Sequence, residues 1–240
     1  MDSVWICMRH FTKELHPGTG TEGLFADPSI SDRLLKKYVG LWNRYDRNYI
    51  SLSVEGEECG IKIAERLPEF VAQFGIPMQR IFVSPYQRTL ETARIVAAWF
   101  PGIEMIIRHE LVELDAGVRS VGTFEEVCAR FPEFGREAHE AFLDACPPYG
   151  ESHSKARDGR VRAFLQELPQ YDGGSFVITH AGIIECMHQL VYGTSDEEVV
   201  AKLAENRSCR YGSILAIGYD RTTNCIEPII DDHCLFEPSS

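Results

Sequence analysis

Short apolar segments alternate with amphipathic helical segments along most of this chain, and this alternation restricts the possible folds more than any other feature of the sequence. Six runs have the length and apolar character of buried strands: residues 4–8, 80–84, 104–109, 175–180, 213–219 and 225–230. Six other segments have helical patterns: residues 57–74, 85–100, 124–131, 134–145, 160–168 and 183–191. The alternation predicts an α/β fold, a three-layer sandwich with helices on both faces of a largely parallel central sheet.

Residues 13–51 interrupt this alternation. The stretch HPGTGTEG at 16–23 is rich in turn residues, and RLLKKYVGLWNRYDRNY at 33–49 mixes basic and aromatic residues without a clean helical stripe. We interpret residues 13–51 as a long insertion that partly covers a site; a solvated loop with a short helix is the alternative. Because no internal repeat or linker is visible, we expect residues 1–240 to form one domain.

The formal net charge of −12 limits the partners that the chain can bind. Nucleic-acid polymers and anionic membranes attract basic surfaces, so we expect neither as a partner. No segment reaches the roughly 18 apolar residues of a membrane span, and the first residues do not resemble a signal peptide. The eight cysteines are scattered singly, without the spacing of a zinc site. We therefore expect a cytoplasmic protein with reduced thiols and no bound metal.

Polar side chains follow three of the predicted strands. Arg9 and His10 follow the first strand, Ser84 ends the second with Arg88 four residues later, and His180 ends the strand at 175–180. Because the carboxyl ends of parallel strands meet at one edge of a sheet, we expect these groups to converge. Arginine binds phosphate through two parallel hydrogen bonds and stays charged at any working pH. The sequence therefore predicts a phosphate site at this edge.

Six segments of the chain resemble, in the same order, the histidine phosphatase superfamily, which includes the cofactor-dependent phosphoglycerate mutases. They are RH at 9–10, LSVEGEECG at 52–60, SPYQRTLETA at 84–93, LVELDAGV at 111–118, YGES at 149–152 and VITHAGII at 177–184. The resemblance covers nearly the whole chain, and it implies a phosphoglycerate mutase-like fold.

The resemblance also implies roles for five residues. It makes His10 the nucleophile and Glu113 the general acid and base. It assigns the binding of the phosphoryl group to Arg9, Arg88 and His180. Neighbouring guanidinium groups disfavour a charged imidazole, so His10 would keep a lone pair for attack on phosphorus and form a phosphohistidine. Since arginines and histidines supply the positive charge, this scheme needs no metal and no cofactor.

Two residues near His10 depart from the family pattern. Phe11 stands where the family usually has glycine, a residue that allows close backbone approach or dihedral angles that phenylalanine resists. This departure bears on the loop geometry and on the activity. Lys13 occupies a position where the mutase branch tends to carry threonine and some phosphatase branches carry arginine. A cation there adds affinity for phosphate, so Lys13 is a further predicted phosphate-binding residue.

The leading hypothesis is a metal-independent phosphatase that hydrolyses a phosphate monoester, with a small phosphorylated molecule as the expected substrate. The alternatives are phosphoryl transfer of the phosphoglycerate mutase type and a phosphate-binding scaffold with weak catalysis. The basic residues of the insertion, Lys36 and Lys37 among them, would fit a larger or more anionic substrate. The sequence leaves open whether the protein forms a homodimer.

Overall fold

The computed structural model describes residues 1–13, 30–204 and 211–234, and in these residues the chain forms a six-stranded sheet. Its strands are β1 (Ser3–Arg9), β2 (Met78–Val83), β3 (Glu104–Ile107), β4 (Gly173–Thr179), β5 (Ser213–Asp220) and β6 (Cys225–Cys234). Their order across the sheet is β3-β2-β4-β1-β5-β6. Strands β1 to β4 run parallel, whereas β5 is antiparallel to both of its neighbours.

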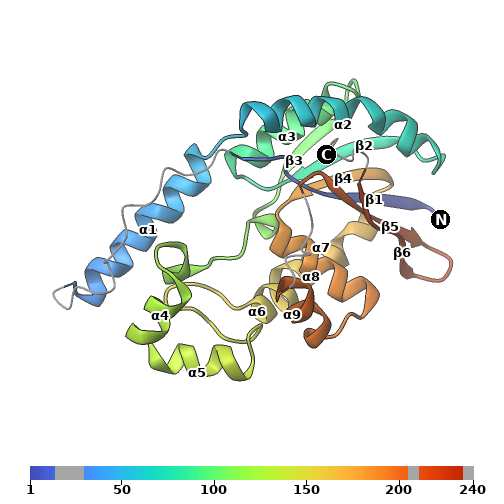
Figure 1. The fold of residues 1–240 in the computed structure, drawn as a ribbon. Coiled ribbons are helices and arrows are strands. Elements are labelled where there is room, and N and C mark those ends of the chain that lie inside the picture. Colours follow the sequence, from blue (N-terminus) through green and yellow to red (C-terminus); the bar gives the residue numbers. More distant parts are fainter. Residues whose placement is uncertain (14–29, 205–210, 235–240) are drawn as a thin grey trace.

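Helices cover both faces of this sheet (Figure 1). α2 (Val54–Ala72) and α3 (Gln87–Ala97) lie on one face, and α7 (Arg162–Glu167) and α8 (Ala181–Tyr192) lie on the other. The side chains of β1 alternate between the two layers: Ile6 and Met8 pack under α2, whereas Trp5 and Cys7 pack under α8. The predicted three-layer sandwich with a largely parallel sheet is therefore confirmed.

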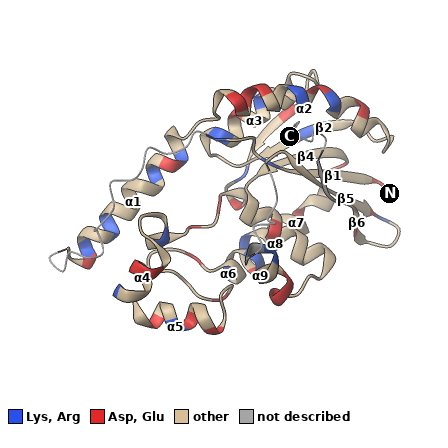
Figure 2. Ribbon diagram, in the orientation of Figure 1, with Lys and Arg blue, Asp and Glu red and all other residues tan. Residues whose placement is uncertain are grey.

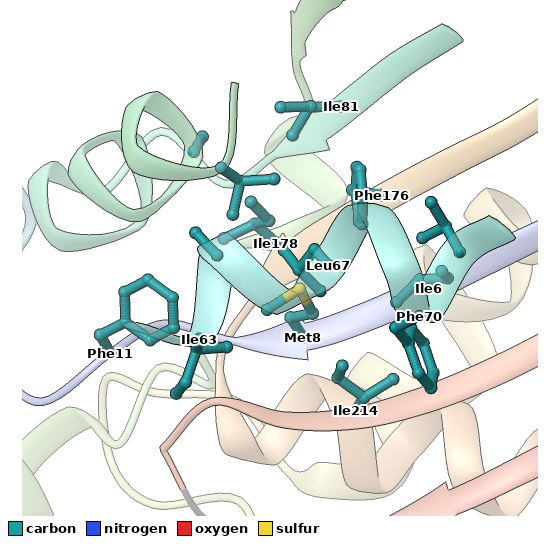
Figure 3. Close-up of a cluster of buried hydrophobic side chains, with 14 of the residues drawn as sticks. Ile6, Met8, Phe11, Ile63, Leu67, Phe70, Ile81, Phe176, Ile178 and Ile214 are labelled. Atoms are coloured by element: carbon teal, nitrogen blue, oxygen red, sulfur yellow. The ribbon is translucent and has the colours of Figure 1, made fainter. Parts of the chain in front are cut away.

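The core under α2 also holds the loop that follows β1. Figure 3 shows Leu67 of α2 close to Met8 of β1, with the ring of Phe11 at one end of the same cluster. The helix begins after Ser53, whose hydroxyl accepts a hydrogen bond from the backbone N–H of Gly56 (3.0 Å). α2 thus packs along the strand that leads into the predicted site.

Residues 33–49 form one regular helix, α1 (Asp32–Tyr49), so the expectation of a segment without a helical stripe is wrong. Ser31 caps the helix by accepting a hydrogen bond from the backbone N–H of Leu34 (3.3 Å). Leu35 and Val39 are buried against a separate apolar cluster contributed by residues 118–145. The turn-rich residues 16–23 lie outside the described residues, and the single-domain organisation with an insertion at 13–51 stays a prediction.

The shorter helical elements are η1 (His109–Leu111), η2 (Gly117–Ser120), α4 (Phe124–Arg130), α5 (Pro132–Glu140), α6 (His153–Ala156), η3 (Arg157–Val161), η4 (Leu168–Gln170) and α9 (Asp196–Ala204). The sequence predicted α4 and α5 but extended α5 five residues too far, and it missed α9. In the described part of the chain, every helix is too short or too polar to span a bilayer.

Candidate active site

Three neighbouring strands, β1, β4 and β2, bring the predicted site residues to one edge of the sheet (Figure 1). Arg9 pairs in register with Thr179, and the backbone N–H of His10 donates to the carbonyl of Thr179 (3.0 Å). On the other side of β4, the backbone N–H of Ser84 donates to Ile178 (3.0 Å). The parallel register therefore places the residues that end all three strands at the same level.

His10 is buried, and hydrogen bonds to both ring nitrogens define its tautomer. Its Nδ1 lies 2.7 Å from the carbonyl oxygen of Phe11, which can only accept, so Nδ1 carries the proton. Its Nε2 accepts a hydrogen bond from Nε of Arg88 (3.2 Å). Burial and the positive charge of Arg88 hold the pKa of His10 well below its usual value. The ring is therefore neutral, with its lone pair on Nε2.

His180 is also fully buried, and its ring lies 5.3 Å from that of His10, centre to centre. Its Nε2 is 2.9 Å from the hydroxyl oxygen of Ser84. When this hydroxyl donates, Nδ1 carries the proton, yet Nδ1 is buried and has no hydrogen-bond partner in the described residues. Desolvation, with the positive charge of Arg88 nearby, lowers the pKa of His180 well below its usual value. In that tautomer, His180 offers a neutral N–H donor on Nδ1.

Arg9 and Lys13 add positive charge on the same side of the sheet. The guanidinium carbon of Arg9 lies 3.8 Å from the centre of the Tyr211 ring, which also lies 5.5 Å from the His10 ring. Burial and the charge of Arg88 lower the pKa of Lys13. Sequence reasoning missed Tyr211, because it lies in a loop far along the chain and no pattern marks it.

Arg88 is buried, and its guanidinium forms a two-pronged contact with Asp46 of α1. Nη1 donates to Asp46 Oδ1 (3.3 Å) and to the Asp46 carbonyl (3.2 Å), while Nη2 donates to Oδ2 (3.3 Å). Asp46 Oδ1 also lies 3.9 Å from Nζ of Lys13. The carboxylate of Asp46 thus binds the cations that the sequence assigned to phosphate, and sequence reasoning did not identify it.

Glu113 lies on the segment after η1, and its side chain is 29% exposed. Its Oε2 is 4.0 Å from the unsatisfied Nδ1 of His180, and its Oε1 accepts from the backbone N–H of Leu114 (2.9 Å). Desolvation raises the pKa of Glu113 above its usual value. Arg160 holds this segment by donating to the carbonyl of Val112 (2.7 Å), and it pairs with Glu151 (2.5 Å).

Phe11 does not fill the site. Its ring is buried in the core under α2, where a Cβ on Gly60 would come within 2.2 Å of it. Its backbone angle φ lies outside the left-handed region that favours glycine. The chain therefore accommodates phenylalanine at this position by turning the ring away from His10 and by having glycine at position 60.

Five of the predicted site residues line one open cavity with a volume of about 1000 Å³, whereas the fully buried His180 is not part of its lining. The lining includes Arg9, His10, Lys13, Arg88 and Glu113 on one side and α1 on the other. The cations that α1 contributes are Arg44 and Arg47; Lys36 and Lys37, which composition had suggested as substrate contacts, lie outside this lining. Among the described residues, no group of three or more His, Cys, Asp or Glu side chains has the arrangement of a metal site.

A family model for the histidine phosphatase superfamily, branch 1, matches residues 41–225, and the chain belongs to this superfamily. A probable fructose-2,6-bisphosphatase of Schizosaccharomyces pombe is 29% identical over 150 residues, which are 58% of this chain and 33% of that protein. The 6-phosphofructo-2-kinase/fructose-2,6-bisphosphatase of Gallus gallus is 28% identical over 141 residues, 58% of this chain and 28% of that protein. The match thus spans about a third of these relatives.

Solved structures of phosphatases share the fold over nearly the full chain. A putative alpha-ribazole-5′-P phosphatase from Escherichia coli superimposes with a TM-score of 0.66, at 16% identity and with 97% of each chain covered. A mycobacterial glucosyl-3-phosphoglycerate phosphatase gives a TM-score of 0.64 at 16% identity, covering 96% of this chain and 97% of that one. At these identities the similarity establishes the fold alone.

Proposed function

We propose that the protein is a metal-independent phosphatase that hydrolyses a phosphate monoester through a phosphohistidine on His10. The observation that carries this proposal is the tautomer of His10, whose unprotonated Nε2 lies beside Arg88 in a buried, cationic site. A neutral imidazole with its lone pair on Nε2 is the form that can attack phosphorus. The attack forms an N–P bond and breaks the bond from phosphorus to the ester oxygen, which splits hydrolysis into two steps.

Cations and donors around His10 suit the binding of a phosphoryl group. Arg9, Arg88 and Lys13 supply positive charge, and the unsatisfied Nδ1–H of His180 supplies a neutral donor. Because a buried donor without a partner is costly, a phosphoryl oxygen that accepts from His180 would stabilise the site. Fixed donors directed at the equatorial oxygens are the main contribution that a protein makes to phosphoryl transfer.

Glu113 is suited to proton transfer in both steps. Its raised pKa keeps a proton on the carboxyl group to a higher pH than usual, and this proton can pass to the leaving oxygen. The resulting carboxylate can then take a proton from the water that attacks the phosphohistidine. Arg160 and Glu151 act as positioning residues, since they fix the backbone that carries Glu113.

The open cavity favours hydrolysis over a mutase-type transfer. A mutase must keep water from the phosphoenzyme, whereas this cavity of about 1000 Å³ is larger than a small phosphorylated acid requires. The named activities of the relatives and structural neighbours concern small phosphorylated molecules. We infer a small phosphorylated substrate and a cytoplasmic location. The reduced thiols of Cys128 and Cys186 support this location.

A direct test is the hydrolysis of 4-nitrophenyl phosphate in the presence of a chelator, with acid and alkaline quenching during turnover. The proposal expects turnover without added metal and a protein-bound phosphoryl group that is lost in acid but survives alkali. If the protein hydrolyses no monoester while inorganic phosphate still raises its Tm, the phosphate-binding scaffold becomes the better description.

The Asp46→Asn variant should bind inorganic phosphate more tightly than the wild type. Asparagine keeps the shape of the side chain but removes the negative charge that competes for Arg88. Hydrogen bonds to charged groups contribute about 1.5 to 3 kcal/mol, so the inhibition constant of phosphate should fall roughly tenfold or more. Asp32→Asn is the matched control, because Asp32 lies on the same helix but pairs with Arg130. Weaker phosphate binding in Asp46→Asn would mean that Asp46 positions Arg88 for the ligand.

A further inference from the structure

Tyr86 is a half-buried aromatic residue beside the site, and core packing does not explain its place in the structure. It lies between β2 and α3, at the N-cap position of α3, where its side chain forms no capping hydrogen bond. Its ring belongs to none of the three apolar clusters that the described residues form. The side chain lines the cavity instead. Its neighbours there are groups of the site, and their contacts with the ring suggest what the residue does.

The guanidinium group of Arg88 lies over the Tyr86 ring, with its carbon 4.7 Å from the ring centre. A cation this close to an aromatic face is attracted by the negative potential of the face. Arg88 also uses its N–H groups to bind Asp46 and His10. A phosphoryl group that binds Arg88 must take over N–H groups from Asp46, whereas the contact with the ring uses none of them. The ring can therefore keep the guanidinium in place while its hydrogen bonds are exchanged.

The rings of His180 and Tyr86 form a T-shaped pair, with their centres 4.7 Å apart and an angle of 66° between their planes. This is a favoured geometry for two aromatic rings. The hydroxyl oxygen of Ser84 also lies 2.9 Å from Nε2 of His180. A hydrogen bond and a ring contact thus fix the imidazole together. Its Nδ1, which is buried without a partner in the part of the chain that the structure describes, then keeps a fixed direction.

The turn that carries Tyr86 is itself held on the edge of the sheet. The hydroxyl of Thr89 lies within hydrogen-bond distance of the carbonyls of Ser84 (2.8 Å) and Tyr86 (2.6 Å). The backbone N–H of Ser84 donates to the carbonyl of Ile178 in β4 (3.0 Å). The ring is therefore attached to a fixed part of the backbone, which a residue that orients other groups requires.

A third contact connects the ring with α1. The guanidinium carbon of Arg47 lies 5.5 Å from the centre of the Tyr86 ring, and both residues line the cavity. Figure 2 shows Lys and Arg residues along α1, the helix that brings Arg47 to this ring. Because the neighbouring Asp46 binds Arg88, α1 meets the phosphate site at two adjacent positions. Tyr86 is thus an aromatic surface shared by Arg88, His180 and Arg47.

We propose that Tyr86 is a positioning residue for phosphoryl transfer, whose ring holds Arg88 through a cation–π contact and His180 through a T-shaped contact. This inference rests on the proposed function of the site, and it concerns the ring rather than the hydroxyl group. Burial raises the pKa of Tyr86 to about 12, so the phenol stays neutral and places no negative charge beside a phosphate dianion. Donors that are oriented before the substrate binds stabilise a transition state without further reorganisation.

Tyr86→Leu and Tyr86→Phe separate the ring from the hydroxyl group. With 4-nitrophenyl phosphate as substrate, Tyr86→Leu should lower kcat/KM roughly tenfold to thirtyfold, because the contacts with the ring are lost. Tyr86→Phe keeps the ring, so its kcat/KM should stay within about threefold of the wild type. Equal losses in the two variants would overturn the proposal, because the hydroxyl group would then be the part of Tyr86 that acts.

A fluorinated ring tests the electrostatic attraction without a large change of shape. Trifluorophenylalanine at position 86 has nearly the shape of phenylalanine, but its fluorine atoms withdraw negative charge from the ring face. Its kcat/KM should therefore fall below that of Tyr86→Phe, by roughly threefold to tenfold. If the fluorinated protein is as active as Tyr86→Phe, the ring does not hold Arg88 through a cation–π contact and the proposal is wrong.

Tyr171→Leu is the matched control, because Tyr171 makes the same two kinds of contact away from the site. The guanidinium carbon of Arg80 lies 5.2 Å from its ring centre, and its ring forms a T-shaped pair with that of Phe82 (5.0 Å). Tyr171 precedes β4, whereas His180 follows it. Tyr171→Leu should lower Tm but leave kcat/KM unchanged. A comparable loss of kcat/KM in this control would overturn the proposal, since lost stability would then explain both variants.

Calorimetric titration with inorganic phosphate makes the test independent of turnover. Tyr86→Leu should weaken phosphate binding roughly tenfold. This loss should be at least about threefold smaller in an Arg88→Gln background, because Tyr86 acts in part through Arg88. If this pattern is found and the wild type hydrolyses no monoester, the proposed function is wrong but the role of Tyr86 in positioning the phosphate donors is supported. If Tyr86→Leu binds phosphate as tightly as an active wild type, the proposed function stands and the role of Tyr86 is overturned.

Discussion

The His10→Ala variant should lose about 10⁴- to 10⁶-fold in kcat for any phosphate monoester, the range seen when the nucleophile or its base is removed from a hydrolase. We expect this loss because two hydrogen bonds orient the His10 ring for attack. Phe11 accepts from Nδ1 and Arg88 donates to Nε2, so the lone pair of Nε2 is directed into the cationic site. His180, the second imidazole of this site, differs because its Nε2 lies 2.9 Å from the hydroxyl oxygen of Ser84.

Steady-state kinetics and trapping of the phosphoenzyme measure this loss. His10→Ala should yield no acid-labile phosphoryl group, yet inorganic phosphate should still raise its Tm, because Arg9 and Arg88 remain. His139→Ala, at an exposed position on α5, serves as the control and should keep wild-type kcat. If His10→Ala keeps activity within tenfold of the wild type, water attacks phosphorus directly or another residue is the nucleophile.

The positions of His10 and His180 could be predicted from the sequence, because the pairing of their strands determines where these two residues lie. Once the first strand and the strand at 175–180 are recognised as parallel neighbours, the positions of His10 and His180 follow from the register. Sequence-local evidence was sufficient for these residues and for Arg88, which is the second residue of α3. Their catalytic and binding roles remain proposals.

Asp46 could not be predicted in this way, because its contact depends on how α1 crosses the site. The apolar residues of α1 do follow a helical period, with the exposed Leu41 on the arc beside the buried Leu35 and Val39, and sequence reasoning did not recognise it among the basic and aromatic residues.

Phe11 illustrates a substitution whose consequence depends on a distant residue. Compared with the glycine usual in the family, phenylalanine was expected to disturb the loop after His10. Its ring instead packs over Gly60 and against Ile63 and Gly212, in the core under α2. Gly60 is far away in the sequence, so no local pattern connects it with position 11. The scaffold hypothesis therefore gains no support from Phe11.

The Glu113→Gln variant should lose about 10²- to 10⁴-fold in kcat for an alkyl phosphate, the usual contribution of a general acid. The loss should be much smaller for the first step with 4-nitrophenyl phosphate, because 4-nitrophenolate leaves without a proton. The wild type should also show an alkaline limb in kcat/KM, since activity falls as Glu113 loses its proton at its raised pKa. Glutamine cannot titrate, so this limb should disappear in the variant.

The raised pKa of Glu113 has a matching effect on stability, which provides a measurement independent of turnover. Between the pKa of about 4.3 for an unfolded glutamate and the raised pKa of Glu113, the native state keeps a proton that the unfolded chain has lost. The free energy of unfolding therefore falls as the pH rises through this window. Because glutamine cannot titrate, the contribution of Glu113 to this fall should be absent in Glu113→Gln.

Urea denaturation at several pH values across this window measures the free energy of unfolding of the wild type, of Glu113→Gln and of the control variant Glu110→Gln. Glu110 is a useful contrast, because its hydrogen bond with Arg108 lowers its pKa. An unchanged pH dependence in Glu113→Gln would show that Glu113 is ionised at neutral pH, and it could not then be the acid that protonates the leaving oxygen.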